Sequence, residues 1–184
     1  PDPTSDVGVA GAQQFILEKV PHWIEKYGPM AAFFCTNDAH TEPLLKRIAE
    51  GKGGYFIEAD MPSPLMGYPG ALGVELSDVA GDFPAILKRV EDAVIKAGGS
   101  GRMGTWAYSY GFTNTLALGE YAKSCIEKDV TPKNFRRNFK MDALLKTFDA
   151  ETPGASWNGT IYKDASTGLE LKNNILVYQD TYIF

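Results

Sequence analysis

The stretch Met30-Ala31-Ala32-Phe33-Phe34-Cys35 is a continuous apolar run that ends at the polar residues Thr36-Asn37-Asp38. Apolar residues without alternation are typical of a strand that is buried on both faces, as in a parallel sheet. Residues 54–57 and 103–108 predict two further short strands. Because these strands alternate with helical patterns, we expect an α/β fold: an open, mostly parallel sheet flanked by helices.

The helical patterns lie on both sides of that run. Apolar residues recur at three- and four-residue steps, which gives each segment one apolar face. Between two of these segments, residues 61–73 carry three prolines and three glycines and predict a long loop. The predicted helices cover residues 9–27, 42–50, 83–97, 112–126 and 132–148.

The end of the chain has a different character. Residues 160–162 and 175–178 are β-rich, and the turn cluster Asp164–Gly168 lies between them, which predicts a C-terminal antiparallel β-hairpin. We therefore expect an α/β lobe over residues 1–150, with a β-rich segment over residues 151–184 packed on it.

Composition excludes several classes of protein. A chain of 184 residues fits one domain or one large lobe of a bigger protein. With a net charge of −5 and no basic patch that stands out, we expect no nucleic-acid partner. No apolar run approaches the ~20 residues that a membrane span needs. Cys35 and Cys125 are too few for a disulfide scaffold, and we expect buried free thiols.

Polar and aromatic residues follow the three predicted strands. Ligands of open α/β sheets bind at the carboxyl ends of the strands. Asn and Asp side chains donate and accept hydrogen bonds there, and Trp and Tyr offer flat apolar faces for stacking. The structural alternative is that Asn37 and Asp38 only cap the following helix. The predicted ligand-binding residues are Asn37, Asp38, His40, Asp60, Ser63, Trp106, Tyr108 and Ser109.

A hydrolase is a weaker alternative. The segment Ala107-Tyr108-Ser109-Tyr110-Gly111 lies between a predicted strand and a predicted helix, the place of a nucleophile elbow, with Ala where such elbows carry their first Gly. The catalytic His normally follows the Ser, but His22 and His40 both precede Ser109. We therefore expect no catalytic residues. The sequence also lacks a phosphate loop and the His and Cys spacing of a metal site, so we expect no cofactor and no metal.

The motif Phe33-Phe34-Cys35-Thr36-Asn37-Asp38, followed by a helix and Gly51, resembles type 1 periplasmic-binding proteins. In those proteins the second lobe opens with a strand that ends in Asn-Asp. Three further segments, residues 1–8, 61–64 and 67–72, resemble an uncharacterised bacterial lipoprotein family of that fold, known as a domain of unknown function.

This resemblance implies a function and a location. It implies that the first lobe and a lipoprotein signal precede Pro1, and that a ligand binds between two lobes, with Asn37, Asp38 and Asp60 as cleft residues. The Pro-rich segment after Asp60 departs from sugar-binding members and leaves the ligand class open. We expect a solute-binding lobe for a small polar ligand (a sugar, nucleoside or amino acid), with ABC transporter membrane subunits as partners, in an extracytoplasmic, membrane-anchored lipoprotein. The alternative is a ligand sensor or regulatory protein of the same fold.

Overall fold

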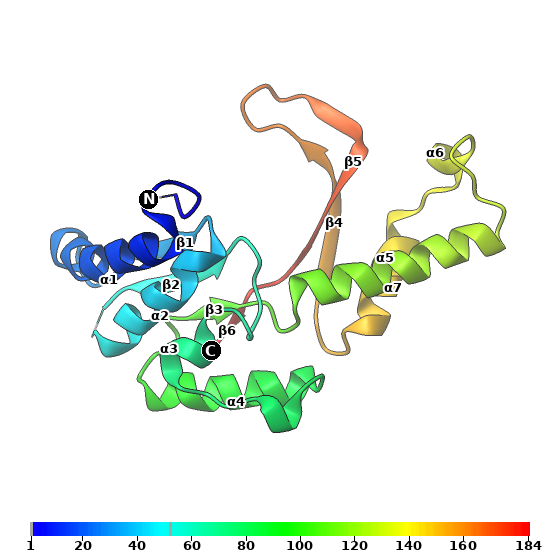
Figure 1. The fold of residues 1–184 in the computed structure, drawn as a ribbon. Coiled ribbons are helices and arrows are strands. Elements are labelled where there is room, and N and C mark those ends of the chain that lie inside the picture. The colour runs from blue at the N-terminus through cyan, green and yellow to red at the C-terminus, as the bar shows by residue number, and fades with distance from the viewer. Residues whose placement is uncertain (1, 52) are drawn as a thin grey trace. The chain divides into compact units, whose positions relative to one another are not determined.

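The computed structural model describes residues 2–51 and 53–184 and divides the chain into two compact units (Figure 1). Unit 1 comprises Pro1–Ser109 and Thr181–Phe184, and unit 2 comprises Tyr110–Asp180. This division differs from the boundary that we predicted at residue 150. The reason is that the helices after Tyr110 pack on one another and on the β-rich segment, so that both belong to the same unit.

The strands of unit 1 form two linked pairs. Strand β1 (Ala32–Cys35) is parallel to β2 (Tyr55–Ala59), and β3 (Gly104–Thr105) is antiparallel to β6 (Tyr182–Ile183). A single parallel bridge between Phe56 and Met103 links β2 to β3. The fold is therefore mixed α/β as expected, but its strands form two-stranded sheets where we expected one open sheet.

The helices of unit 1 enclose a common core. They are α1 (Gly8–Tyr27), α2 (Thr41–Glu50), α3 (Tyr68–Leu72) and α4 (Phe83–Lys96), with the short 3₁₀ helices η1 (Asp38–His40) and η2 (Ser77–Val79). Helix α4 begins where the Asp82 side chain accepts a hydrogen bond from the Ala85 amide at 3.1 Å, which satisfies one free donor of the first turn. The fully buried core side chains include Val20, Leu45, Ile48, Val90, Val94 and Met103.

The Pro-rich segment after β2 belongs to the core. It contains α3, and Tyr68 at the start of that helix is almost fully buried. Its hydroxyl donates a hydrogen bond to the Gly104 carbonyl at 2.7 Å, and its ring packs edge-on against Phe56 and Phe184. The segment that we predicted as a loop therefore contains a short helix, and through Tyr68 it packs against β2, β3 and the last residue of the chain.

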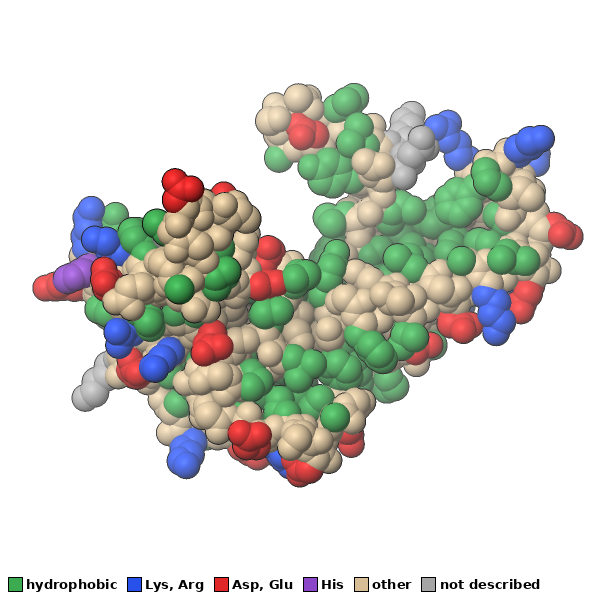
Figure 2. All heavy atoms as spheres, viewed as in Figure 1, with side chains coloured by type: hydrophobic (Ala, Val, Ile, Leu, Met, Phe, Trp, Pro, Cys, Tyr) green, Lys and Arg blue, Asp and Glu red, His purple; other side chains and the backbone are tan. Residues whose placement is uncertain are grey.

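Unit 2 consists of helices and one hairpin. It contains α5 (Tyr110–Glu127), α6 (Phe135–Asn138), α7 (Met141–Glu151) and the antiparallel strands β4 (Trp157–Lys163) and β5 (Glu170–Gln179). This confirms the predicted hairpin, and the Asp164 carboxylate fixes its turn by accepting the amides of Ser166 and Thr167 at 3.1 and 2.7 Å. The helix predicted over 132–148 is wrong as one element, because Phe139 adopts an extended backbone between α6 and α7. Figure 2 shows hydrophobic side chains gathered on the visible face of this unit.

Candidate functional site

The carboxyl ends of β1 and β2 carry the first candidate residues. Asn37 follows β1, and its side-chain oxygen accepts a hydrogen bond from the Ala39 amide at 3.0 Å, which caps η1. This is the capping role that we weighed as the structural alternative. The bond engages only the carbonyl oxygen of the side chain, so capping positions the amide nitrogen of Asn37 at this edge as well.

Asp38 and Asp60 form an acid pair at the same edge. The pKa of Asp38 is raised to about 6, mainly because the side chain is partly buried and secondly because it is hydrogen-bonded to the Asp60 carboxyl. Asp38 Oδ1 is buried and has no hydrogen-bond partner among the described residues. Asp60 is exposed, and its Oδ1 accepts the Met61 amide at 3.1 Å. The pair therefore presents oxygen acceptors to a ligand at this edge.

A buried acid, Glu58, lies one step inside β2. Its side chain is 8% exposed, and Oε2 accepts a hydrogen bond from the Thr181 hydroxyl at 3.0 Å. Burial raises the pKa of Glu58 to about 7. Because Phe56 is paired with Met103, Glu58 and Thr105 lie two residues further on the same face of neighbouring strands. Glu58 Oε1 and Thr105 Oγ1 are both buried without a hydrogen-bond partner in the described part of the chain.

Sequence reasoning missed this buried cluster. Glu58 belongs to a segment that we recognised as a strand end, yet we predicted only Asp60 from it. The signal that could have found Glu58 is an acidic residue inside an otherwise apolar strand, because such a residue has to be paired or protonated. Nothing local in the sequence links it to Thr181, which lies 123 residues away.

Three other predicted site residues lie outside the acid pair. Ser63 is buried, and its hydroxyl accepts the Leu65 amide at 3.1 Å, which shapes the segment before α3. His40 ends η1 and is half-buried. Tyr108 packs its ring on Phe83 with 5.6 Å between the ring centroids.

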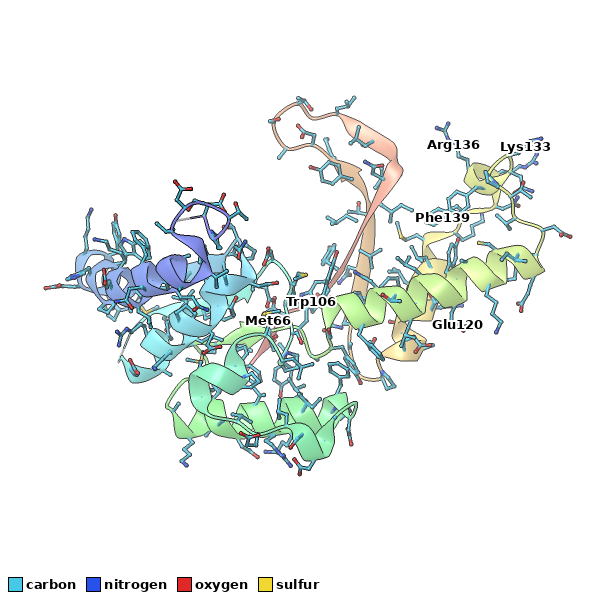
Figure 3. All side chains as sticks on the ribbon, in the orientation of Figure 1. Met66, Trp106, Glu120, Lys133, Arg136 and Phe139 are labelled. Atoms are coloured by element: carbon cyan, nitrogen blue, oxygen red, sulfur yellow. The ribbon has the colours of Figure 1, made fainter. Side chains whose placement is uncertain are left out.

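The last two predicted residues follow β3. Trp106 is buried directly after the strand (Figure 3), and Ser109 is the half-buried last residue before unit 2. The structure therefore brings Asn37, Asp38 and Asp60 together at one edge. It places Tyr108 on the start of α4 and Ser63 inside its own turn.

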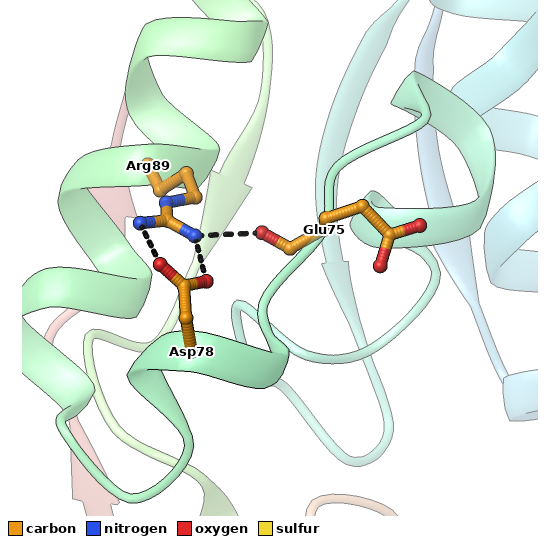
Figure 4. A network of polar contacts seen from close by, with 3 residues as sticks. All are labelled: Glu75, Asp78 and Arg89. Carbon is orange, nitrogen blue, oxygen red and sulfur yellow. Dashed lines mark hydrogen bonds and ion pairs between the residues drawn. The ribbon is translucent and has the colours of Figure 1, made fainter.

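A second polar network, on α4, has a structural role. Arg89 donates hydrogen bonds to both carboxylate oxygens of Asp78 and, at 2.9 Å, to the Glu75 carbonyl (Figure 4). This fork holds the turn around η2 against α4, and the bond from Arg89 keeps the pKa of Asp78 below its usual value. Both side chains of the ion pair are exposed to solvent.

The described residues show neither a metal cluster nor a membrane-spanning helix. Over residues 2–51 and 53–184, no three His, Cys, Asp or Glu side chains are grouped to hold a metal ion. No helix in this part of the chain combines the length and apolarity needed to cross a bilayer. Two surface hollows lie near the amino ends of β1 and β2, beside Phe33 and Gly53, away from the acid pair.

Comparison with known proteins supports the fold and the family. An uncharacterized protein of Treponema pallidum (strain Nichols) is 32% identical over 103 residues, which cover 56% of this chain and 45% of that protein. A crystal structure from Clostridium difficile 630, of a protein described as a proposed transcriptional regulator, has a TM-score of 0.76 and 22% identity, and it covers 100% of this chain and 49% of its own. The chain thus spans about half the length of these relatives.

Two family models match the sequence. One without a description matches residues 115–184. The other, the protein of unknown function DUF3798, matches residues 1–104, which is more than half of the chain. This confirms the coarser part of the resemblance, membership in a family of unknown function, and the chain belongs to the DUF3798 family.

Proposed function

We propose that the chain is part of a protein that binds a small polar solute at the carboxyl ends of β1 and β2, without catalysis. The observation that supports this proposal most directly is Asp38, which holds a buried oxygen without a described partner beside the carboxyl of Asp60. Carboxyl ends of parallel strands are the usual place of ligand sites in α/β folds.

The chemistry of the edge favours a ligand that is rich in hydrogen-bond donors. Carboxylate oxygens accept from hydroxyl and amino groups, which sugars, nucleosides and amino acids all carry. Trp106, which we predicted as a stacking partner for such a ligand, lies directly after β3 and is 9% exposed. The resemblance to type 1 periplasmic-binding proteins extends the proposal to a lipoprotein outside the cytoplasm that serves ABC transporter membrane subunits.

A thermal-shift screen tests the binding proposal. The complete gene product and this chain are each screened against sugars, nucleosides and amino acids. A ligand at 100 times its Kd adds about 2.7 kcal/mol of stability to the protein that binds it. We expect Asp38→Asn and Asp60→Asn to weaken binding of the hit at least ~10-fold, the order of one lost charge-assisted hydrogen bond.

The controls separate the site from the rest of the surface. Asp92→Asn, on the exposed face of α4, should leave binding unchanged. A serine-directed phosphonate probe should leave Ser109 unlabelled. Full binding by both acid-pair variants, or the absence of any hit, would contradict the proposal.

A ligand sensor is the second candidate function. It is favoured by one observation, the description of the Clostridium difficile structure as a proposed transcriptional regulator. A sensor changes its affinity for a partner macromolecule when the ligand binds, whereas a transport protein delivers the ligand itself. Pull-down of partners from the native organism, with and without the hit of the screen, distinguishes the two functions.

A further inference from the structure

The two faces of the β4–β5 hairpin differ in how they are covered. The face with Trp157 and Gly159 packs on α7: the Trp157 ring lies 4.7 Å from that of Phe148, and a side chain at Gly159 would come within 2.5 Å of the Met141 sulfur. The opposite face is bare. There, Leu176 and Tyr178 are 46% and 42% exposed, and Ile161, at the far end of the packed face, is also exposed at 45%.

The composition of the bare face favours burial. Its register pairs Asn158 with Tyr178 and Thr160 with Leu176, so apolar side chains alternate with small neutral polar ones. Asp180 borders this patch, and its carboxylate accepts a hydrogen bond from the Asn158 side chain at 3.1 Å. Interfaces are depleted in charged residues at their centre in the same way. Apolar residues on both faces of a strand are typical of a sheet that is covered on both sides.

The edges of the hairpin are also open. Over the described residues β4 and β5 form a two-stranded sheet, and neither strand pairs with a third. Their outer edges present unpaired backbone N–H and C=O groups, which is the usual template for a further strand. A two-stranded hairpin alone is at best marginally stable in water.

Unit 2 leaves many of its described apolar side chains exposed. Helix α5 exposes Leu116, Leu118 and Ile126, and Cys125, the one cysteine of the unit, is free. The hydrophobic side chains on the visible face of unit 2 in Figure 2 thus face solvent. Among its described residues, this unit has neither a disulfide nor a metal cluster that could stabilise it instead. The buried residues described in this unit are Thr113, Ala117, Leu144, Phe148, Thr152, Trp157 and Gln179.

We infer that the bare face and open edges of the hairpin form an intramolecular interface, completed by at least one strand and one apolar helix of a longer polypeptide. The occupant is the part of the protein that the relatives carry outside the half matched by this chain. The Clostridium difficile structure covers this chain entirely, yet about half of that protein lies outside the match, which is enough for a further layer of sheet and helix. This inference is independent of the proposed solute site.

Hydrogen exchange on the complete gene product and on the 184-residue chain tests the inference. We expect the amides of 158–162 and 176–179 to exchange at least ~100-fold more slowly in the complete protein than in this chain. Equal exchange rates in both would overturn the inference. Slow exchange of these amides in the 184-residue chain itself would also overturn the inference. If that protection rises with protein concentration, a second copy covers the hairpin. If it does not, unit 1 covers it.

A matched pair of variants gives a second readout in the complete protein. Leu176→Arg on the bare face should remove most of the added protection and lower the melting temperature. Ile95→Arg, at a similarly exposed position on α4, should change neither. Equal effects of the two variants would overturn the inference, and a gene product that ends with this chain would do so as well.

Discussion

The two units of the chain differ in how completely they bury their apolar residues. In unit 1, α1, α2, α4 and the strands share one core, and even the segment after β2 contributes Tyr68 to it. In unit 2, one face of a hairpin packs on α7 and the other faces solvent. Regular helices and strands thus occur both in a unit that buries its apolar residues in a common core and in a unit that leaves many of them exposed. The difference lies in what covers the second face.

Removing a core side chain of unit 1 should have the largest effect. Leu45→Ala, at a fully buried position of α2, should reduce the free energy of unfolding by roughly 2–5 kcal/mol, because it loses apolar burial and leaves a cavity. Leu118→Ala on the exposed side of α5 is the matched control and should change it by less than about 0.5 kcal/mol. Urea unfolding followed by far-UV circular dichroism reports both units, because both contain helices. Equal costs for the two variants would remove the contrast between the units.

The stability of unit 1 should depend on pH through Glu58. Its pKa of about 7 in the folded state lies above the ordinary 4.5, so the folded state holds the proton more tightly than the unfolded chain. The contribution of Glu58 to stability is therefore greatest below pH 4.5, is lost as the pH rises to about 7, and is constant above. The shift corresponds to about 3 kcal/mol.

Urea midpoints measured from pH 4.5 to pH 7.5 give this dependence. Glu58→Gln should flatten most of it. Asp38 contributes in the same direction, since its pKa is raised to about 6, and Asp38→Asn separates the two contributions. The same pH dependence in Glu58→Gln as in the unchanged protein would show that Glu58 does not cause it.

The hydroxyl of Tyr68 should have a smaller effect. Tyr68→Phe leaves the Gly104 carbonyl without its donor and should cost roughly 1–3 kcal/mol, while the ring contacts remain. Tyr178→Phe, at an exposed position of the hairpin, serves as the control. If both variants unfold at the same urea concentration, the bond to Gly104 does not stabilise unit 1.

The exposed fork between Arg89 and Asp78 should matter least. Asp78→Ala removes a surface ion pair that is screened by water and salt, so we expect no measurable change in the melting temperature at physiological salt. A clear loss of stability would mean that the turn around η2 supports the core more than its exposure suggests. Differential scanning calorimetry at low and high salt makes the comparison.

Local patterns predicted local features. The apolar run 30–35 and the segment 54–57 are the parallel strands β1 and β2, and the turn cluster 164–168 connects the hairpin. The expectation that Asp38 and Asp60 lie near each other follows from strand polarity, and the structure brings them together.

Features that depend on distant parts of the chain could not be predicted. Tyr68 is a core residue because its hydroxyl bonds to Gly104 in β3 and its ring packs on Phe184, and both partners are distant in the sequence. The boundary between the two units after Ser109 depends on the packing of α7 on both α5 and β4. A local stretch of sequence does not show such packing. Glu58 is stabilised by a threonine from the far end of the chain.

The return of the chain to unit 1 after unit 2 sets an order in time. Phe184 is buried in the core of unit 1, and its amide donates a hydrogen bond to the Met103 carbonyl at 3.0 Å. During translation, unit 2 leaves the ribosome before this last piece of unit 1 exists. Unit 1 therefore cannot close its core until synthesis has passed Phe184. Until then the open edge of its sheet presents unpaired backbone groups, which are the usual starting point of aggregation in a nascent chain.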